Sequence, residues 1–203
     1  GATGCVGSHV MKLYHESGEY ARSAIYKEEV PDQLYENHVF LDYNEVDSLL
    51  EATIGCEQVF IVIPDSPSMA MHARHIIYAC ETNGVSHYVL ISGAGVEVCP
   101  DNMVSQRLLA MEKLFISSRL SGIILRPVFF MQNFINHFPP SPDHKIIQPM
   151  GAGKVNYVDV RDVALASYQT LSRLSAGEKF EKNVWCITGD KSYTVDEIVE
   201  IFS

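Results

Sequence analysis

Three glycines spaced three residues apart open the sequence, in the run Gly1-Ala2-Thr3-Gly4-Cys5-Val6-Gly7. Glycines at this spacing let a strand turn sharply into a helix, bring backbone N–H groups close to a pyrophosphate and pack the helix tightly on its sheet. Residues 8–17, which follow, have the character of a helix. The pattern predicts a dinucleotide-binding loop, and a plain glycine turn is the alternative.

Cationic side chains accompany the next predicted strand, residues 21–26, which Lys27 follows directly. In a dinucleotide-binding fold the adenosine ribose lies at the end of this strand, where an acid selects NAD and a cation accommodates the 2′-phosphate of NADP. Lys27, together with Arg22, therefore favours NADP. A solvated charged turn is the alternative, because Glu28 and Glu29 follow at once and weaken the local positive potential.

An acid, Asp42, closes the following predicted strand, residues 37–42, just before a predicted helix over residues 44–52. At the carboxyl end of a strand its carboxylate is placed to accept the adenine amino group. Alternatively, Asp42 caps the helix that follows.

Strands and helices continue to alternate along the next 80 or so residues. Continuous apolar runs predict strands over residues 59–64, 87–92 and 122–127, with helices over residues 69–83 and 103–118 between them. Unbroken apolar strands are typical of a parallel sheet covered on both faces. We therefore expect an α/β fold, a Rossmann-type doubly wound parallel sheet, whose first strand is missing from this sequence.

The pattern changes after residue 128. Residues 129–134 are rich in aromatic side chains, and residues 139–153 read as a loop, so this segment either shapes a substrate pocket or places core aromatics under a loop. A strand over residues 155–158, a helix starting at Asp159 or Asp162 and a strand over residues 184–187 follow, and Thr194 with Glu197 forms a capping box. We expect a dinucleotide-binding core over residues 1–128 and a substrate-binding region over residues 129–203, interleaved with the last strands and cut off inside its final helix.

Composition excludes several classes of protein. The 203 residues are 47% hydrophobic and 20% charged, as in one globular unit with a real core. A net charge of -10 argues against a nucleic-acid-binding surface, which needs clustered lysine and arginine. No apolar run approaches the roughly 20 residues of a membrane span. We therefore expect a small-molecule partner rather than a nucleic acid or a membrane.

Cysteine and histidine usage predicts neither a disulfide framework nor a metal site. The five cysteines are odd in number and contain no Cys-x-x-Cys pair: Cys5, Cys56, Cys80, Cys99 and Cys186. His72 and His75 fall on one helical turn but have no third ligand. A reducing, cytoplasmic setting fits this composition best.

Four motifs, taken together in their order and spacing, resemble the NmrA-like branch of the atypical short-chain dehydrogenase/reductases. They are the run from Gly1 to Gly7, Ile91-Ser92-Gly93-Ala94-Gly95, Ile124-Leu125-Arg126-Pro127 with Phe130-Met131-Gln132-Asn133-Phe134, and Tyr157-Val158-Asp159-Val160-Arg161-Asp162-Val163-Ala164. The resemblance covers essentially the whole chain. It implies a Rossmann sheet that binds NAD(P)(H), a small C-terminal substrate region, and either reduction of a small quinone, carbonyl or iminium or a purely regulatory role as a cofactor sensor with a protein partner.

The resemblance also implies roles for individual residues. The phosphate loop of the family falls on Gly1, Thr3, Gly4, Cys5, Val6 and Gly7, the 2′-phosphate position on Lys27 and the adenine contact on Asp42. Ile63 and Pro64 would line the ribose and nicotinamide side, and Ser92 matches the approximate position of the family's serine. Pro127, Val128 and Phe130 would flank the nicotinamide, and Asn133 would face the substrate.

Two departures from the family pattern leave the catalytic residues unassigned. No tyrosine is followed by lysine four places on, so the acid of the typical reductases is absent, and Leu108 stands where relatives carry a lysine. Hydride transfer needs only a bound nicotinamide held against an electrophilic carbon, so a quinone or iminium can take its proton from water or from a tyrosine such as Tyr157. We expect an NADPH-dependent oxidoreductase acting on a small planar or aromatic molecule. A non-catalytic NAD(P)-sensing regulator, which Leu108 favours, and an inactive fragment are the alternatives.

Overall fold

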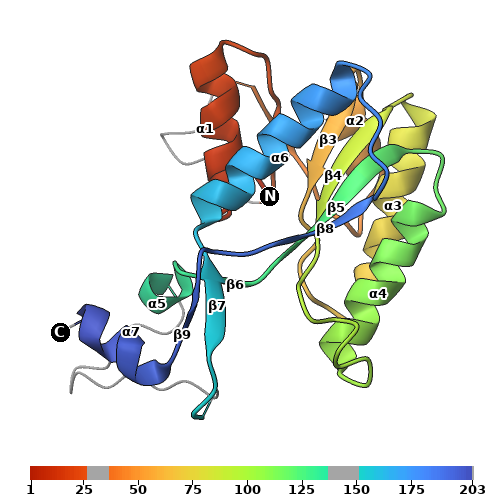
Figure 1. Cartoon of the computed structure of the whole chain (residues 1–203). Helices are drawn as coiled ribbons and strands as arrows, with labels where there is room; N and C mark the ends of the chain where they lie inside the picture. The colour runs from red at the N-terminus through yellow and green to blue at the C-terminus, as the bar shows by residue number, and fades with distance from the viewer. Residues whose placement is uncertain (27–36, 137–150, 203) are drawn as a thin grey trace.

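The computed structural model describes residues 1–26, 37–136 and 151–202. Strands and helices alternate along most of the described chain. The helices cover both faces of a central sheet (Figure 1). The four strands of this sheet run parallel in the order β3 (Gln58–Ile61), β4 (His87–Ile91), β5 (Ser121–Pro127) and β8 (Val184–Ile187). The predicted α/β parallel architecture is confirmed.

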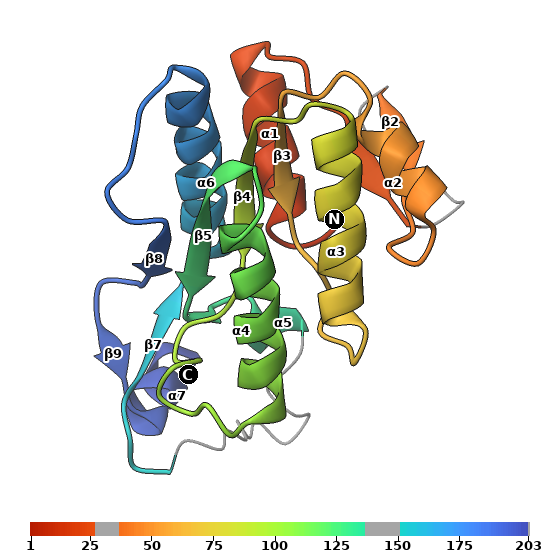
Figure 2. The ribbon, with the colours of Figure 1, turned by 90° about the vertical axis from the view of Figure 1, so that its right-hand side faces the viewer.

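Two helical layers enclose the sheet (Figures 1 and 2). On one face α1 (Gly7–Ser17) packs against α6 (Val160–Ser175), and their apolar side chains share one core cluster with β4 and β5. On the other face α2 (Val46–Thr53), α3 (Met69–Thr82) and α4 (Met103–Ile116) share a second cluster. Helix α1 ends where Gly18 adopts the left-handed conformation, with φ of 73°, which glycine allows without steric cost.

The strands β1 (Ser23–Ile25) and β2 (His38–Phe40) form a separate parallel pair that is not hydrogen-bonded to β3. Between β1 and β3 lies a cavity of about 350 Å³, lined by both strands and by α1. Side chains bridge the two sheets at either end of this cavity. Arg22 donates to the carbonyl oxygen of Ile54 (2.8 Å) at the amino ends of β1 and β3, and the Tyr43 hydroxyl donates to the carbonyl oxygen of Val62 (3.2 Å) at the carboxyl ends of β2 and β3. Strands β1 and β3 therefore flank the cavity and run in the same direction.

A small second unit lies beside the main sheet (Figure 1). Strand β7 (Val155–Val158) pairs in parallel with β6 (Phe129–Phe130) and antiparallel with β9 (Ser192–Tyr193). The short helices α5 (Asn133–Asn136) and α7 (Val195–Phe202) complete this unit around Phe134, Tyr157 and Ile198. The predicted capping box of α7 is confirmed: the Thr194 N–H donates to Glu197 Oε2 (2.7 Å), and the Glu197 N–H donates to Thr194 Oγ1 (3.2 Å).

The expected region 129–203 is divided between these two units. Helix α6 packs on the main sheet and β8 pairs with β5, although both follow residue 128 in the sequence. Neither β6 nor α5 was expected. Within the described part of the chain, no helix is both long and apolar enough to cross a membrane.

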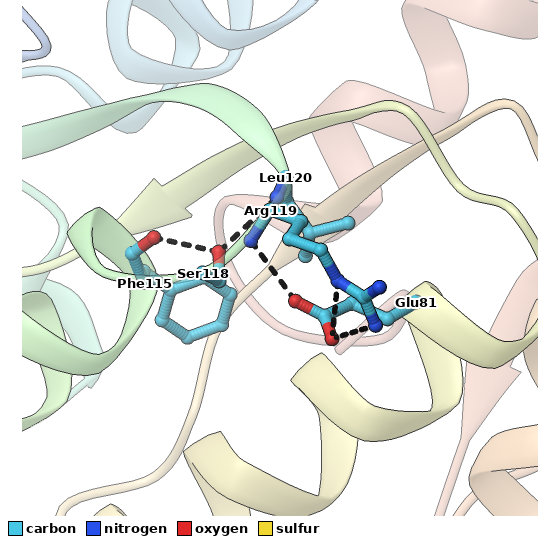
Figure 3. A network of polar contacts seen from close by, with 5 residues as sticks. All are labelled: Glu81, Phe115, Ser118, Arg119 and Leu120. Atoms are coloured by element: carbon cyan, nitrogen blue, oxygen red, sulfur yellow. Dashed lines mark hydrogen bonds and ion pairs between the residues drawn. The ribbon is translucent and has the colours of Figure 1, made fainter.

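The amino end of β5 is tied to α3 by an exposed ion pair (Figure 3). Both Nε and Nη2 of Arg119 donate to Glu81 Oε2, at 3.3 and 3.0 Å, and the Arg119 backbone N–H donates to Glu81 Oε1 at 2.9 Å. The adjoining Ser118 hydroxyl donates to the Phe115 carbonyl (2.7 Å) and accepts from the Leu120 N–H (3.3 Å). These contacts fix the turn between α4 and β5.

Candidate functional site

The glycine run folds into a tight turn that leads directly into α1. The Gly4 N–H donates to the Gly1 carbonyl (3.0 Å), and the Ser8 N–H donates to the Gly4 carbonyl (2.9 Å). A Cβ at position 7 would overlap the Gly1 carbonyl oxygen, so only glycine fits there. Gly1, Thr3, Gly4 and Cys5 are exposed. The turn therefore presents an open backbone surface, with Gly7 required by close packing.

The start of α1 is suited to an anion. Its N-cap residue, Val6, provides no side-chain cap, and the first turn contains no acidic residue. The amino end of a helix carries a partial positive charge, so a phosphate is stabilised there. In α1 the N–H groups of Ser8 and His9 already donate to the Gly4 and Val6 carbonyls, so this charge is what the helix offers an anion. The Val6 side chain is buried in the core between α1 and α6, which leaves only its backbone for a ligand.

The residues expected around the adenosine are only partly brought together. Asp42 follows β2, and its Oδ1 accepts hydrogen bonds from the Asn44 N–H (2.8 Å) and from Asn44 Nδ2 (2.9 Å). Its side chain therefore stabilises a turn and does not cap α2, whose N-cap is Glu45. Lys27 lies outside the described residues. Arg22 lies at the opposite end of β1, where Nη1 donates to carbonyls at the end of α2. The expectation that Arg22 helps to accommodate the 2′-phosphate is therefore wrong.

Beyond β3, Ile63 is a buried core residue and Pro64 is exposed. The next residue, Asp65, accepts a hydrogen bond from Arg107 of α4 at 2.8 Å. Leu108, the neighbour of Arg107, lies against Gly93, since a Cβ built on Gly93 would be 3.3 Å from Leu108 Cδ1. The position where relatives were expected to carry a lysine is therefore filled by an aliphatic side chain.

Ser92 belongs to a polar network that the sequence reasoning missed. Its hydroxyl donates to Glu112 Oε1 (2.5 Å), and Glu112 also accepts from Arg126 Nε (2.9 Å) and Nη2 (2.6 Å). Arg126 Nη1 lies 3.0 Å from Glu97 Oε1. The carboxylate of Glu112 raises the pKa of Arg126 above its ordinary value by accepting these hydrogen bonds. The sequence did contain a signal for this network: Arg126 is a charged residue in the apolar run of β5, and Glu112 is an acid on the preceding helix, α4.

The remaining predicted residues lie where β5 passes into the small unit. Pro127 is buried, and its carbonyl accepts from the Ala94 N–H (2.9 Å). Val128 donates through its N–H to the Ile187 carbonyl (3.0 Å), and Phe130 pairs with Val158. Asn133 begins α5 and is half-buried.

Tyr157 is 6% exposed and packs against Phe134, with 5.2 Å between the ring centroids. Burial raises the pKa of Tyr157, which makes it a weaker acid than a tyrosine in water. Two residues on, Asp159 caps α6, and its hydrogen bonds from Arg161 lower its pKa to about 2. The described residues contain no group of three or more histidine, cysteine, aspartate or glutamate side chains able to hold a metal ion.

A family model described as NAD(P)H-binding matches residues 1–172 of the chain. The chain belongs to this NAD(P)H-binding family. The glycine turn and α1, which has no side-chain cap, fit the cofactor, because Gly7 lets the turn pack closely on the Gly1 carbonyl while the backbone before it stays exposed. The domain is an NAD(P)H-binding domain, as the sequence predicted.

Curated relatives of this NAD(P)H-binding chain include the "NAD(P)H azoreductase" of Xenophilus azovorans, 26% identical over 207 residues, which cover 100% of this chain and 71% of the relative. Another is the "Prestalk A differentiation protein A" of Dictyostelium discoideum, 28% identical over 170 residues, which cover 81% of this chain and 51% of the relative.

Solved structures share the fold. A triphenylmethane reductase from Citrobacter sp. in complex with NADP(H) superposes with a TM-score of 0.80 at 21% identity, covering 100% of this chain and 73% of that one. An NADPH-dependent quinone oxidoreductase from Escherichia coli, in complex with NADPH, gives a TM-score of 0.77 at 20% identity, covering 98% and 71%. The Rossmann-like architecture of the NAD(P)H-binding chain is thus shared with reductases of several substrates.

Proposed function

We propose that this protein is an NADPH-dependent oxidoreductase of the NmrA-like branch that reduces a small quinone, carbonyl or iminium-type acceptor. The observation that carries the proposal is the glycine turn, in which Gly7 passes beneath the Gly1 carbonyl at the uncapped start of α1. Bound NADPH supplies the hydride, and the protein supplies binding and orientation. The printed functions of the relatives, azo, triphenylmethane and quinone reduction, support this class of acceptor.

The side chains able to donate a proton at the site limit the class of acceptor that we propose. Ser92 uses its only O–H on Glu112, Leu108 is aliphatic, and burial raises the pKa of Tyr157. A simple carbonyl becomes an alkoxide when it accepts the hydride, so it gains most from a protein acid. A quinone becomes a stabilised hydroquinone anion that takes its proton from water, and a cationic iminium becomes a neutral amine without a proton. We therefore place quinones and iminium-type cations ahead of simple carbonyls.

The five free cysteines agree with the reducing cytoplasm that we predict.

The test compares the two cofactors by calorimetry and follows NADPH oxidation at 340 nm with a panel of quinones, iminium-type dyes and aldehydes. We expect NADPH to bind more tightly than NADH, and Lys27→Ala to weaken NADPH binding about tenfold while NADH binding is unchanged. Lys113→Ala, on the exposed side of α4, is the matched control. Failure to bind either cofactor contradicts the proposal, and equal binding of both contradicts the role of Lys27.

A second function, a non-catalytic sensor of the cofactor that binds a protein partner, is favoured by Leu108 in place of a lysine and by the committed hydroxyl of Ser92. Tight NADPH binding without turnover of any acceptor, and a partner that binds in only one redox state of the cofactor, would identify the sensor.

A further inference from the structure

The segment between β4 and α4, residues 93–102, lies at the carboxyl end of the sheet (Figure 2). Its two ends are fixed by backbone contacts. At the start, the Ala94 N–H donates to the Pro127 carbonyl at 2.9 Å. At the end, Asn102 Oδ1 caps α4 by accepting from the Val104 N–H at 2.8 Å. Between these points the N–H groups of Val98 and Cys99 both donate to the Gly95 carbonyl, which forms a local turn without reaching the sheet.

Two neighbouring side chains hold the middle of this segment: Val96 is buried in the core, at 3% exposure, and Glu97 pairs with Arg126 of β5. Arg126 reaches Glu97 through Nη1 (3.0 Å) and Glu112 through Nε and Nη2 (2.9 and 2.6 Å). The planar guanidinium has donors directed in fixed orientations, so a bidentate hold on Glu112 also fixes the direction of Nη1. The orientation of Nη1 toward Glu97 is therefore fixed by the two hydrogen bonds to Glu112.

Burial makes this hold stiff. The Glu112 side chain is 3% exposed and that of Arg126 is 13% exposed, whereas Glu97, at 72%, lies in water. Few water molecules can therefore compete for the hydrogen bonds of the Arg126–Glu112 pair, and Glu112 Oε1 also accepts a hydrogen bond from Ser92. Glu97 is the outer member, so its removal should loosen the turn at residues 97–99, while Val96 stays buried and the Arg126–Glu112 pair stays intact.

From this arrangement we propose that Arg126 and Glu97 are positioning residues that hold the 93–102 segment against the acceptor side of the cofactor site. Ligands of parallel α/β sheets bind beyond the carboxyl ends of the strands, where this segment meets Pro127. The inference rests on the proposed oxidoreductase function. It assigns to Glu97 an effect on the acceptor and none on the phosphate loop, which lies on α1.

The experiment uses Glu97→Gln in the full chain, with Glu81→Gln as the matched control, since Glu81 also pairs with an arginine, at the other end of β5. We expect hydrogen exchange of the Val98 and Cys99 amides to become about tenfold faster in Glu97→Gln. With quinone and iminium acceptors, kcat/KM should fall about tenfold, mainly through KM, and the NADPH dissociation constant should be unchanged. Glu97→Asp, which keeps the charge, should recover part of the loss.

Several outcomes overturn the inference. They are unchanged exchange in Glu97→Gln, faster exchange with unchanged kcat/KM, a matching loss of NADPH affinity, or the same effects in Glu81→Gln. If the unmodified protein binds NADPH but reduces no acceptor, the proposed function fails by itself. In that case the exchange rates still decide whether Glu97 holds the segment.

Discussion

The two ends of strand β5 each carry an arginine paired with a glutamate from a neighbouring helix, and the two pairs differ in their surroundings. At the amino end, Arg119 is 85% exposed and Glu81 21% (Figure 3). At the carboxyl end, Arg126 is 13% exposed and Glu112 3%. Water screens the first pair, while the second is desolvated and shares its carboxylate with Ser92. The same residue types thus serve to close a turn at one end and to organise a site at the other.

The largest effect is expected from removing the buried arginine. Arg126→Met leaves Glu112 charged and unpaired in the interior, which should lower the free energy of unfolding by about 3–5 kcal/mol. Urea denaturation measures it. Arg119→Met, the matched change at the exposed end, should cost no more than about 1 kcal/mol. Combining Arg126→Met with Glu112→Leu should restore part of the loss, and equal costs at the two ends would refute the contrast.

Two glycines give a comparison of intermediate size. A Cβ at Gly7 would overlap the Gly1 carbonyl oxygen, and a Cβ at Gly122, near the amino end of β5, would overlap that of Tyr88. Each substitution by alanine should therefore destabilise the fold by about 1–3 kcal/mol, as overpacking does. Only Gly7→Ala should also weaken NADPH binding, by more than tenfold in calorimetry. Equal NADPH affinity in both variants would contradict a role of the glycine turn in cofactor binding.

The smallest effect concerns pH. The backbone N–H of Arg119 and then its guanidinium lower the pKa of Glu81 below its ordinary value. A lowered folded-state pKa stabilises the protein above the unfolded-state pKa, about 4.3 for glutamate, and this stabilisation is lost as the pH falls through the folded value. Thermal denaturation of Glu81→Gln should therefore show a shallower loss of stability below about pH 5. A curve identical to that of the unmodified protein would mean that the exposed pair contributes nothing.

Much of the fold could be predicted from local patterns. Apolar runs located β3, β4 and β5, and Gly18 and Gly84 marked helix ends. Asp159 or Asp162 was predicted to start α6, and Asp159 is the residue that caps it. These features depend on neighbours in the sequence. The pairing of β8 with β5 and the packing of α6 on α1 depend on contacts between distant segments, so local patterns could not predict them. The division at residue 128 stays a prediction.

The candidate site was predictable where backbone chemistry defines it. Gly7 follows from spacing alone, because only glycine tolerates the close approach. The direction of a side chain does not follow from spacing: Arg22 turns to the carbonyls after α2, and Ser92 turns to Glu112. The roles expected for Ile63, Pro64, Asn133 and Lys27 stay predictions. The network of Arg126 joins three segments, so no single motif could have shown it.

Side-chain hydrogen bonds connect the strands β1 and β2 to the rest of the fold. Among the described residues, β1 and β2 share ladder hydrogen bonds only with each other, and side chains such as Arg22 and Tyr43 join them to the segments around β3. Local opening of this pair breaks no ladder hydrogen bond of the four-stranded sheet. Local opening of the β1–β2 pair can therefore occur without opening β4 and β5.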